Sequence, residues 1–227
     1  MHIGLIGGIG VAATIVYYQR LAAAVAERGG SKFDLTVVHG DIQELIRNNL
    51  ADRREEQARA FLPLVERLRD AGCDCAALTS LGGHFCFDEL AARSPLPLVS
   101  GVAPLDDFFV RSGIYRIGLL GTRLVMRTRL YGQLATTHAI ALDDELDTIA
   151  QTYQDMAVAG ACSPEQRDLL IHAGRRLVKA GAEAIVLAGT DLNLAFDGRD
   201  VGYPVIDALD VHVALLADLA TGRAPLA

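Results

Sequence analysis

An internal repeat is the feature that most constrains how this chain folds. Residues 71–84 and residues 180–191 both begin with Ala-Gly, continue through a short apolar run and end in small hydroxylated or glycyl residues. Ala-Gly is typical of a helix end, and the apolar runs have the length of buried strands. Open α/β sheets bind small ligands just beyond the carboxyl ends of parallel strands. The repeat therefore predicts two similar halves with a ligand site between them.

A second pair of similar segments supports the duplication. Residues 3–7 read Ile-Gly-Leu-Ile-Gly and residues 117–121 read Ile-Gly-Leu-Leu-Gly, each typical of a strand that ends in a turn. Both pairs occur in the same order, which indicates a pseudo-repeat. We predict an α/β fold of two three-layer α/β/α halves with parallel sheets, related by a pseudo-twofold and facing each other across a ligand cleft. The first half is expected to comprise residues 1–100 plus 208–227, and the second residues 101–207.

Capping residues mark where several of the predicted helices begin. Ser163, Pro164 and Gln166 form an N-cap, a first-turn proline and the third residue of a capping box. Asp41 and Thr122 are expected to cap the helices that follow them. The helix after Thr122 is predicted over residues 123–134.

Composition excludes several classes of protein. The 227 residues are 51% hydrophobic, enough to bury a full core, and 21 basic against 28 acidic residues give a net charge of −7. This balance argues against a nucleic-acid surface or an anionic membrane as partner. The first residues lack the pattern of a signal peptide, and apolar runs stay below the ~20 residues that span a bilayer. We expect a cytoplasmic protein.

The four cysteines do not predict a metal site. Their positions lack the paired Cys-x-x-Cys spacings of structural zinc, so no metal is expected. Cys73 and Cys75 are interpreted as small buried residues of a strand or its entrance. Cys86 follows the first predicted loop and is considered as a displaced nucleophile.

A glycine-rich turn follows the first predicted strand. Gly7, Gly8 and Gly10 do not fit the spacing of a dinucleotide-binding turn, so a nucleotide cofactor is not expected. Such a turn at a helix N-terminus can instead hold a carboxylate through backbone N–H groups. Gly8 and Gly10 are therefore candidate substrate-binding residues.

The chain resembles aspartate/glutamate racemases. Residues 7–10, Gly-Gly-Ile-Gly, followed by Ala-Thr-Ile-Val-Tyr-Tyr at residues 13–18, are similar to the opening of that family. The resemblance covers nearly the whole chain and includes residues 118–122 with Met126, residues 187–191, and residues 204–207 with His212. It implies an enzyme without a cofactor, a small amino-acid-like or dicarboxylic acid as substrate, and a homodimer. It also implies a structural role for Asp207 and His212.

The sequence departs from this family at the catalytic positions. Family racemases that work without pyridoxal phosphate use two cysteines on opposite sides of the substrate α-carbon. The first aligns with Thr79 or Ser80, and the second with Gly189. An aliphatic alcohol is too weakly acidic to act as its own base, and glycine carries no proton. The resemblance therefore implies a racemase-like isomerase or lyase without the thiol pair, or alternatively an inactive amino-acid-binding sensor.

The remaining candidates lie at predicted strand ends. Thr79 and Ser80, followed by glycines, predict hydroxyls and exposed N–H groups that stabilise an anion; residues 79–81 also resemble the Thr-Ser loop of arylmalonate decarboxylases. His84 is a candidate acid or base, or a loop anchor. The resemblance aligns Asp191 with a family glutamate, which implies an acid or base role. The other substrate-binding candidates are His39, Arg47 (or Arg53 or Arg54), Thr122, Arg167, Gly189 and Thr190. For some of them, a position in a loop, a helix cap or the surface explains the residue equally well.

Overall fold

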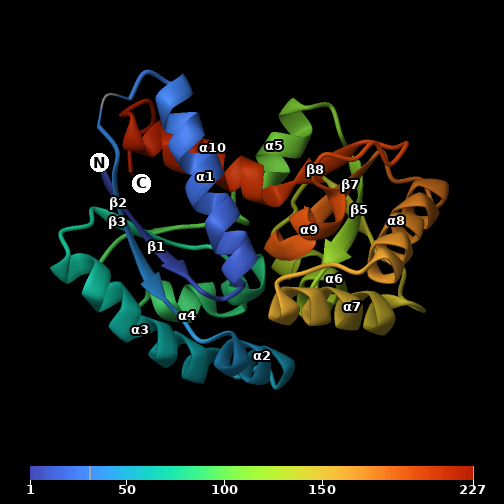
Figure 1. The fold of residues 1–227 in the computed structure, drawn as a ribbon, viewed down its shortest axis with the longest axis horizontal. Helices are drawn as coiled ribbons and strands as arrows, with labels where there is room; N and C mark the ends of the chain where they lie inside the picture. Colours follow the sequence, from blue (N-terminus) through green and yellow to red (C-terminus); the bar gives the residue numbers. More distant parts are fainter. Residues whose placement is uncertain (31, 227) are drawn as a thin grey trace. The chain divides into compact units, whose positions relative to one another are not determined.

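The computed structural model describes residues 1–30 and 32–226 and contains two compact units. The second unit is Val102–Leu209, and the first is formed by the chain on either side of it. Ser31 and Ala227, both within the predicted first half, lie outside the described residues. Each unit contains one sheet of four parallel strands with flanking helices (Figure 1). The prediction of an α/β fold with two parallel sheets is confirmed.

The sheet of the first unit consists of β1 (His2–Gly7), β2 (Asp34–His39), β3 (Cys75–Leu78) and β4 (Leu98–Val99), in the order β2-β1-β3-β4. β1 and β3 are almost entirely buried, as expected for parallel strands covered on both faces. Figure 1 shows α1 and α10 on one side of the sheet and α3 on the other. The helices are α1 (Val11–Glu27), α2 (Ile42–Leu50), α3 (Arg54–Asp70), the short turn η1 (Leu81–Cys86), α4 (Phe87–Ala91) and α10 (Ala208–Ala220).

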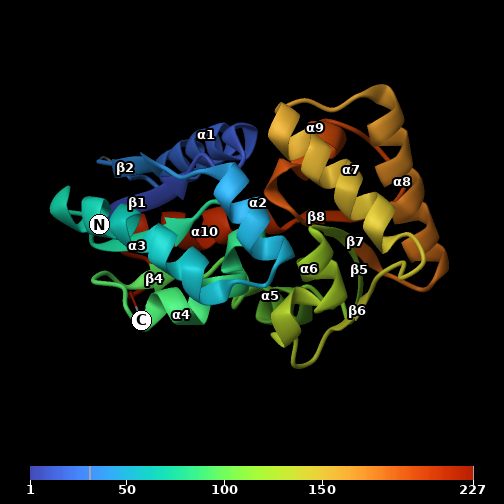
Figure 2. The same cartoon turned by 90° about the horizontal axis from the view of Figure 1, so that it is seen from below.

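The second unit repeats this strand order. Its sheet consists of β5 (Arg116–Gly121), β6 (His138–Ile140), β7 (Ala184–Ala188) and β8 (Val205–Asp207), in the order β6-β5-β7-β8. Figure 2 shows α7 and α8 side by side, and both contact β5. The helices are α5 (Leu105–Arg111), α6 (Arg123–Arg127), η2 (Leu130–Gly132), α7 (Leu146–Ala159), α8 (Pro164–Lys179), η3 (Thr190–Leu192) and α9 (Asn193–Phe196).

The predicted helix caps are confirmed. Asp41 Oδ1 accepts hydrogen bonds from the N–H groups of Gln43, at 2.7 Å, and Glu44. Thr122 Oγ1 accepts one from the Val125 N–H at 3.3 Å. Ser163 and Gln166 form the reciprocal capping box of α8. Each cap satisfies a backbone donor that has no partner inside its helix.

The predicted helix over residues 123–134 is too long. α6 ends at Arg127, and left-handed φ angles follow at Arg129 (53°), Leu130 (59°) and Tyr131 (60°). A right-handed helix cannot continue through this conformation, which costs about 1–2 kcal/mol per non-glycine residue. Leu130 is instead buried in the core.

In the part of the chain that the structure describes, no helix is long and apolar enough to cross a membrane.

Candidate functional site

Three loops of the first unit meet at the carboxyl end of its sheet. Gly7 pairs with His39, so the residues that follow β1 and β2 lie side by side, and a Cβ at Gly8 would lie 2.4 Å from His39 Nδ1. The Gly8 N–H donates to Thr14 Oγ1 at 2.9 Å, and that oxygen lies 3.4 Å from Thr79 Oγ1. The structure therefore brings together Gly8, His39 and Thr79, and adds Thr14, which the sequence analysis did not single out.

The hydroxyl groups of this unit are largely engaged with the backbone. Thr79 is fully buried, and both its N–H and its Oγ1 donate to the Ile6 carbonyl at 3.1 Å. Thr14 Oγ1 donates to the Gly10 carbonyl at 3.0 Å. Ser80 Oγ accepts from the Gly83 N–H at 3.3 Å and caps η1. The expectation of exposed N–H groups is wrong for Thr79 and Gly83, because the Thr79 N–H donates to the Ile6 carbonyl of β1 and the Gly83 N–H donates to the Ser80 carbonyl within the loop.

His84 ties the loop to the neighbouring strand end. Its Nδ1 lies 2.8 Å from the Ser80 carbonyl, and its Nε2 accepts from the Gly101 N–H at 2.9 Å, which assigns the proton to Nδ1. The side chain is 3% exposed, and burial lowers the pKa of His84 to about 4. With both nitrogens occupied by the backbone, the geometry favours the anchor over the acid or base.

A second buried histidine supports this anchor. His212 lies in α10, edge-on to His84 with 6.3 Å between the ring centres, and its Nδ1 lies 2.9 Å from the Tyr17 hydroxyl. Burial, and then the neighbouring His84, lowers the pKa of His212 to about 3. A Cβ at Gly101 would lie 2.9 Å from the His212 ring. The backbone at Gly101 and the His212 ring therefore pack without room for a side chain at position 101. These contacts join α1, α10 and the loop after β3.

The candidate arginines of this unit are all exposed. Arg47 is exposed on α2, and Arg54 Nε pairs with Asp52 at 2.9 Å. Arg53 precedes α3 and is also exposed. The link between α2 and the loop is instead Asn49, whose Nδ2 donates to the Gly82 carbonyl at 3.1 Å.

Cys86 does not have the environment of a nucleophile. It is fully buried, and its Sγ donates to the Gly83 carbonyl at 3.4 Å. Burial raises the pKa of Cys86 to about 12, whereas a reactive cysteine needs an accessible thiolate. Cys75 is also fully buried and its pKa is raised to about 11, mainly by burial. Among residues 1–30 and 32–226, no group of three His, Cys, Asp or Glu side chains could hold a metal ion.

In the second unit, the loops after β5 and β7 are adjacent. Gly121 pairs with Ala188, so Thr122 and Gly189 follow neighbouring strands. Thr122 is half-buried and its Oγ1 caps α6. Gly189 has an extended backbone (φ −150°), but a Cβ there would lie 2.6 Å from the Tyr153 ring and 3.1 Å from its hydroxyl. Tyr153 therefore fills the space of a side chain at position 189.

A buried polar cluster lies at this strand end. Asp191 is 1% exposed, and its Oδ2 accepts a hydrogen bond from the Tyr153 hydroxyl at 3.4 Å. Burial, and then the Asp191 charge, raises the pKa of Tyr153 well above its usual value. Thr190 Oγ1 and Asn193 Oδ1 are buried and have no hydrogen bond of good geometry within the described part of the chain. Buried polar atoms without partners point to a water or a ligand.

Arg167 lies in the first turn of α8 and is half-buried. One of its terminal nitrogens donates to the Cys162 carbonyl at 3.5 Å, and its Nε is buried without a hydrogen-bond partner among the residues described. A guanidinium in this state retains donors for a carboxylate.

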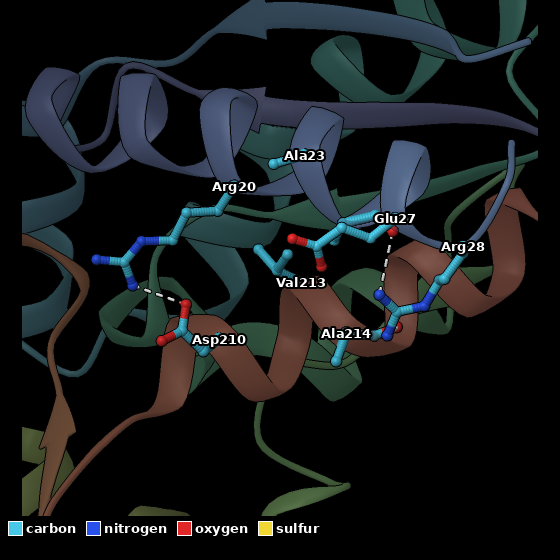
Figure 3. A pocket seen from close by; sticks show the side chains of 8 residues that line it. Arg20, Ala23, Glu27, Arg28, Asp210, Val213 and Ala214 are labelled. Carbon is cyan, nitrogen blue, oxygen red and sulfur yellow. Dashed lines mark hydrogen bonds and ion pairs between the residues drawn. The ribbon is translucent and has the colours of Figure 1, made fainter.

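A surface pocket of about 270 Å³ lies elsewhere in the first unit, between α1 and α10 (Figure 3). The ion pairs Arg20–Asp210 and Arg28–Asp218, each at 2.7 Å, lie along it. Its lining comes from these two helices rather than from the predicted site residues.

The fold and the strand-end loops define a class: α/β proteins with two parallel-sheet units whose loops carry hydroxyls and a buried carboxylate. The family model of Asp/Glu/hydantoin racemases matches residues 6–216. The chain belongs to this family, as the resemblance in its sequence predicted.

Solved structures agree with this assignment. A candidate Asp/Glu racemase from Yersinia pestis is 26% identical over 97% of this chain and 99% of its own, with a TM-score of 0.80. The aspartate racemase from Picrophilus torridus has the same fold, at 18% identity over 98% of this chain and 95% of its own, with a TM-score of 0.80. An aspartate racemase homologue from Pyrococcus horikoshii OT3 matches at 21% identity over 97% and 99%, with a TM-score of 0.75.

Proposed function

We propose that the protein is an isomerase or lyase that performs cofactor-independent proton transfer, elimination or decarboxylation next to the carboxylate of a small amino-acid-like or dicarboxylic acid. The observation that carries this proposal is the buried Asp191 carboxylate at the carboxyl end of β7, in a chain of the Asp/Glu/hydantoin racemase family. A carboxylate in a water-poor site can exchange a proton with a carbon acid more readily than one in water.

The roles follow from how each candidate is bonded. Thr79 cannot supply a base through its hydroxyl, because that group donates to the Ile6 carbonyl. His84 acts as the loop anchor, so Asp191 is the acid or base among the candidates. Thr190 offers a buried hydroxyl that interacts with Tyr153 and has no hydrogen bond of good geometry in the described chain, and Arg167 offers a buried Nε without a partner there. We assign these two residues to the substrate carboxylate, with Ser80 and Thr122 as further hydroxyls near the strand ends.

The second candidate function is an amino-acid-binding sensor without catalysis. It is favoured by the positions that align with the family cysteines, since the hydroxyls of Thr79 and Ser80, the two candidates for the first position, are bonded to the backbone, and Gly189 has no side chain. A sensor would retain the binding groups of the loops and lose exchange at the α-carbon.

Exchange in deuterated water separates the two functions. The protein is incubated with L- and D-Asp, L- and D-Glu and simple dicarboxylic acids, and α-deuterium is followed by NMR with heat-denatured protein as control. Deuterium incorporation supports the enzyme. Saturable binding without incorporation supports the sensor. The oligomeric state in the same samples, measured by light scattering, tests the proposed homodimer.

A further inference from the structure

The second unit contains an acid–base group that the sequence analysis did not identify. Tyr153 lies in α7, which places its ring against Gly189 and its hydroxyl against Asp191. Both neighbours belong to the loop that follows β7, and Tyr153 is separated from Asp191 by 38 positions in the sequence. The tertiary fold therefore places the Tyr153 phenol beside the Asp191 carboxylate, at the carboxyl end of β7.

We propose that Tyr153 is a catalytic residue that acts with Asp191 as a proton relay in the reaction proposed above, on which this inference rests. In this relay the bond between the substrate α-carbon and its hydrogen breaks, and the proton passes to Tyr153 Oη. The original hydroxyl proton of Tyr153 passes at the same time to Asp191 Oδ2, and the electron pair of the C–H bond remains on the substrate, delocalised into its carboxylate. The reverse sequence returns a proton to carbon.

Three observations support a relay through the neutral phenol. First, Tyr153 is 5% exposed and Asp191 is 1% exposed, so bulk water is excluded from the pair. Second, Asp191 Oδ2 lies 3.4 Å from the Tyr153 hydroxyl and accepts from it, so the carboxylate is a neighbouring acceptor for the phenol proton. Third, the raised pKa of Tyr153 disfavours a free phenolate, so its own proton must leave as another arrives.

The neighbouring groups offer polar contacts to a substrate. Thr190 Oγ1 and Asn193 Oδ1 are buried in the same loop and short helix, and neither has a hydrogen bond of good geometry among the described residues, although the Thr190 hydroxyl interacts with that of Tyr153. A hydroxyl donor and an amide fit the carboxylate and the ammonium or hydroxyl of a small acid. The absence of a side chain at Gly189 leaves room for the phenol to approach this position.

Tyr153→Phe tests the relay, because it removes the hydroxyl and retains the ring that packs on Gly189. We expect kcat for α-deuterium exchange to fall about 100-fold or more, with KM and the melting temperature nearly unchanged. Tyr203→Phe is the matched control, because the Tyr203 ring also packs against a glycine, Gly174, and its hydroxyl donates to the Ile171 carbonyl at 3.0 Å. This control should retain wild-type exchange.

The outcomes separate the relay from the proposed function. If the wild-type protein exchanges and Tyr153→Phe exchanges at the same rate, the relay is wrong and the proposed function stands. If the wild-type protein incorporates no α-deuterium into any of the acids, both the relay and the proposed function are wrong. Gly189→Ala tests the packing without activity: it should lower the melting temperature, and this loss should be smaller when the same substitution is made in a Tyr153→Ala background than in the wild type. A Gly189→Ala variant as stable as the wild type would contradict the contact and the relay.

Discussion

The loop after β3 in the first unit and the loop after β7 in the second hold equivalent positions in their sheets, but their polar groups are used differently. In the first, Thr79, Ser80 and His84 bond to the backbone of their own unit. In the second, Asp191 bonds to the Tyr153 side chain, and Thr190 Oγ1 has no hydrogen bond of good geometry in the described chain. The comparison teaches that the polar groups of the first loop hold its backbone in place, and it is the reason why we propose proton transfer in the second loop.

The largest expected effect is on activity in the second unit. Asp191→Asn keeps the size of the side chain and removes its ability to take a proton. We expect deuterium exchange to fall about 100- to 10,000-fold, the usual contribution of an acid–base group. Stability should change little, because the amide oxygen can still accept from Tyr153. An exchange rate within threefold of the wild type would mean that proton transfer lies elsewhere.

The next effect is on stability in the first unit. His84→Ala leaves the Gly101 N–H without its acceptor and removes one of the two donors to the Ser80 carbonyl, at a cost of about 2–5 kcal/mol in the free energy of unfolding. His172→Ala, at an exposed histidine of α8, is the control and should cost less than about 0.5 kcal/mol. Urea denaturation measures both. Equal costs for the two variants would contradict the role of His84 as an anchor.

Acid should weaken the first unit through its two buried histidines. The pKa values of His84 and His212 are lowered to about 4 and about 3, so both are neutral when folded and take up protons on unfolding. Their contribution is complete above pH 6.5 and is lost as the pH falls towards 4. We expect the free energy of unfolding to drop by roughly 2–4 kcal/mol between pH 7.5 and pH 5. His84→Gln should show a smaller drop, and an unchanged drop would contradict the assignment.

The smallest effect is expected at Thr79. Thr79→Val removes the side-chain donor to the Ile6 carbonyl, leaves the backbone donor, and should cost about 1 kcal/mol of stability. Exchange should fall less than about tenfold, because this hydroxyl is not the base in our account. A loss comparable with that of Asp191→Asn would place chemistry in the first unit and remove the contrast between the loops.

The sequence predicted the elements that depend on local pattern. Apolar runs such as residues 184–188 became buried parallel strands, and the capping box at Ser163 and Gln166 began a helix as expected. The resemblance placed the chain in its family. The catalytic and binding assignments, including Asp191, stay predictions until they are measured.

What the sequence did not reveal depends on tertiary contacts. Tyr153 lies among the buried positions of α7, a periodicity that indicates burial but not which residue it faces. Its contact with Gly189 arises only when α7 packs on the sheet. The left-handed conformation at Arg129, Leu130 and Tyr131 likewise has no glycine or asparagine to signal it. The bonding of His84 could not be distinguished from an active-site role because both use the same residue type.

A crystal structure with a bound dicarboxylate such as malonate tests the central claim most directly. We predict that a carboxylate oxygen of the ligand lies about 2.6–3.2 Å from Thr190 Oγ1, and that the adjacent carbon approaches Tyr153 Oη or Asp191 to within about 3.5 Å. A ligand that occupies the protein without touching Thr190, Asp191 or Tyr153 would contradict the assignment of proton transfer to the second unit.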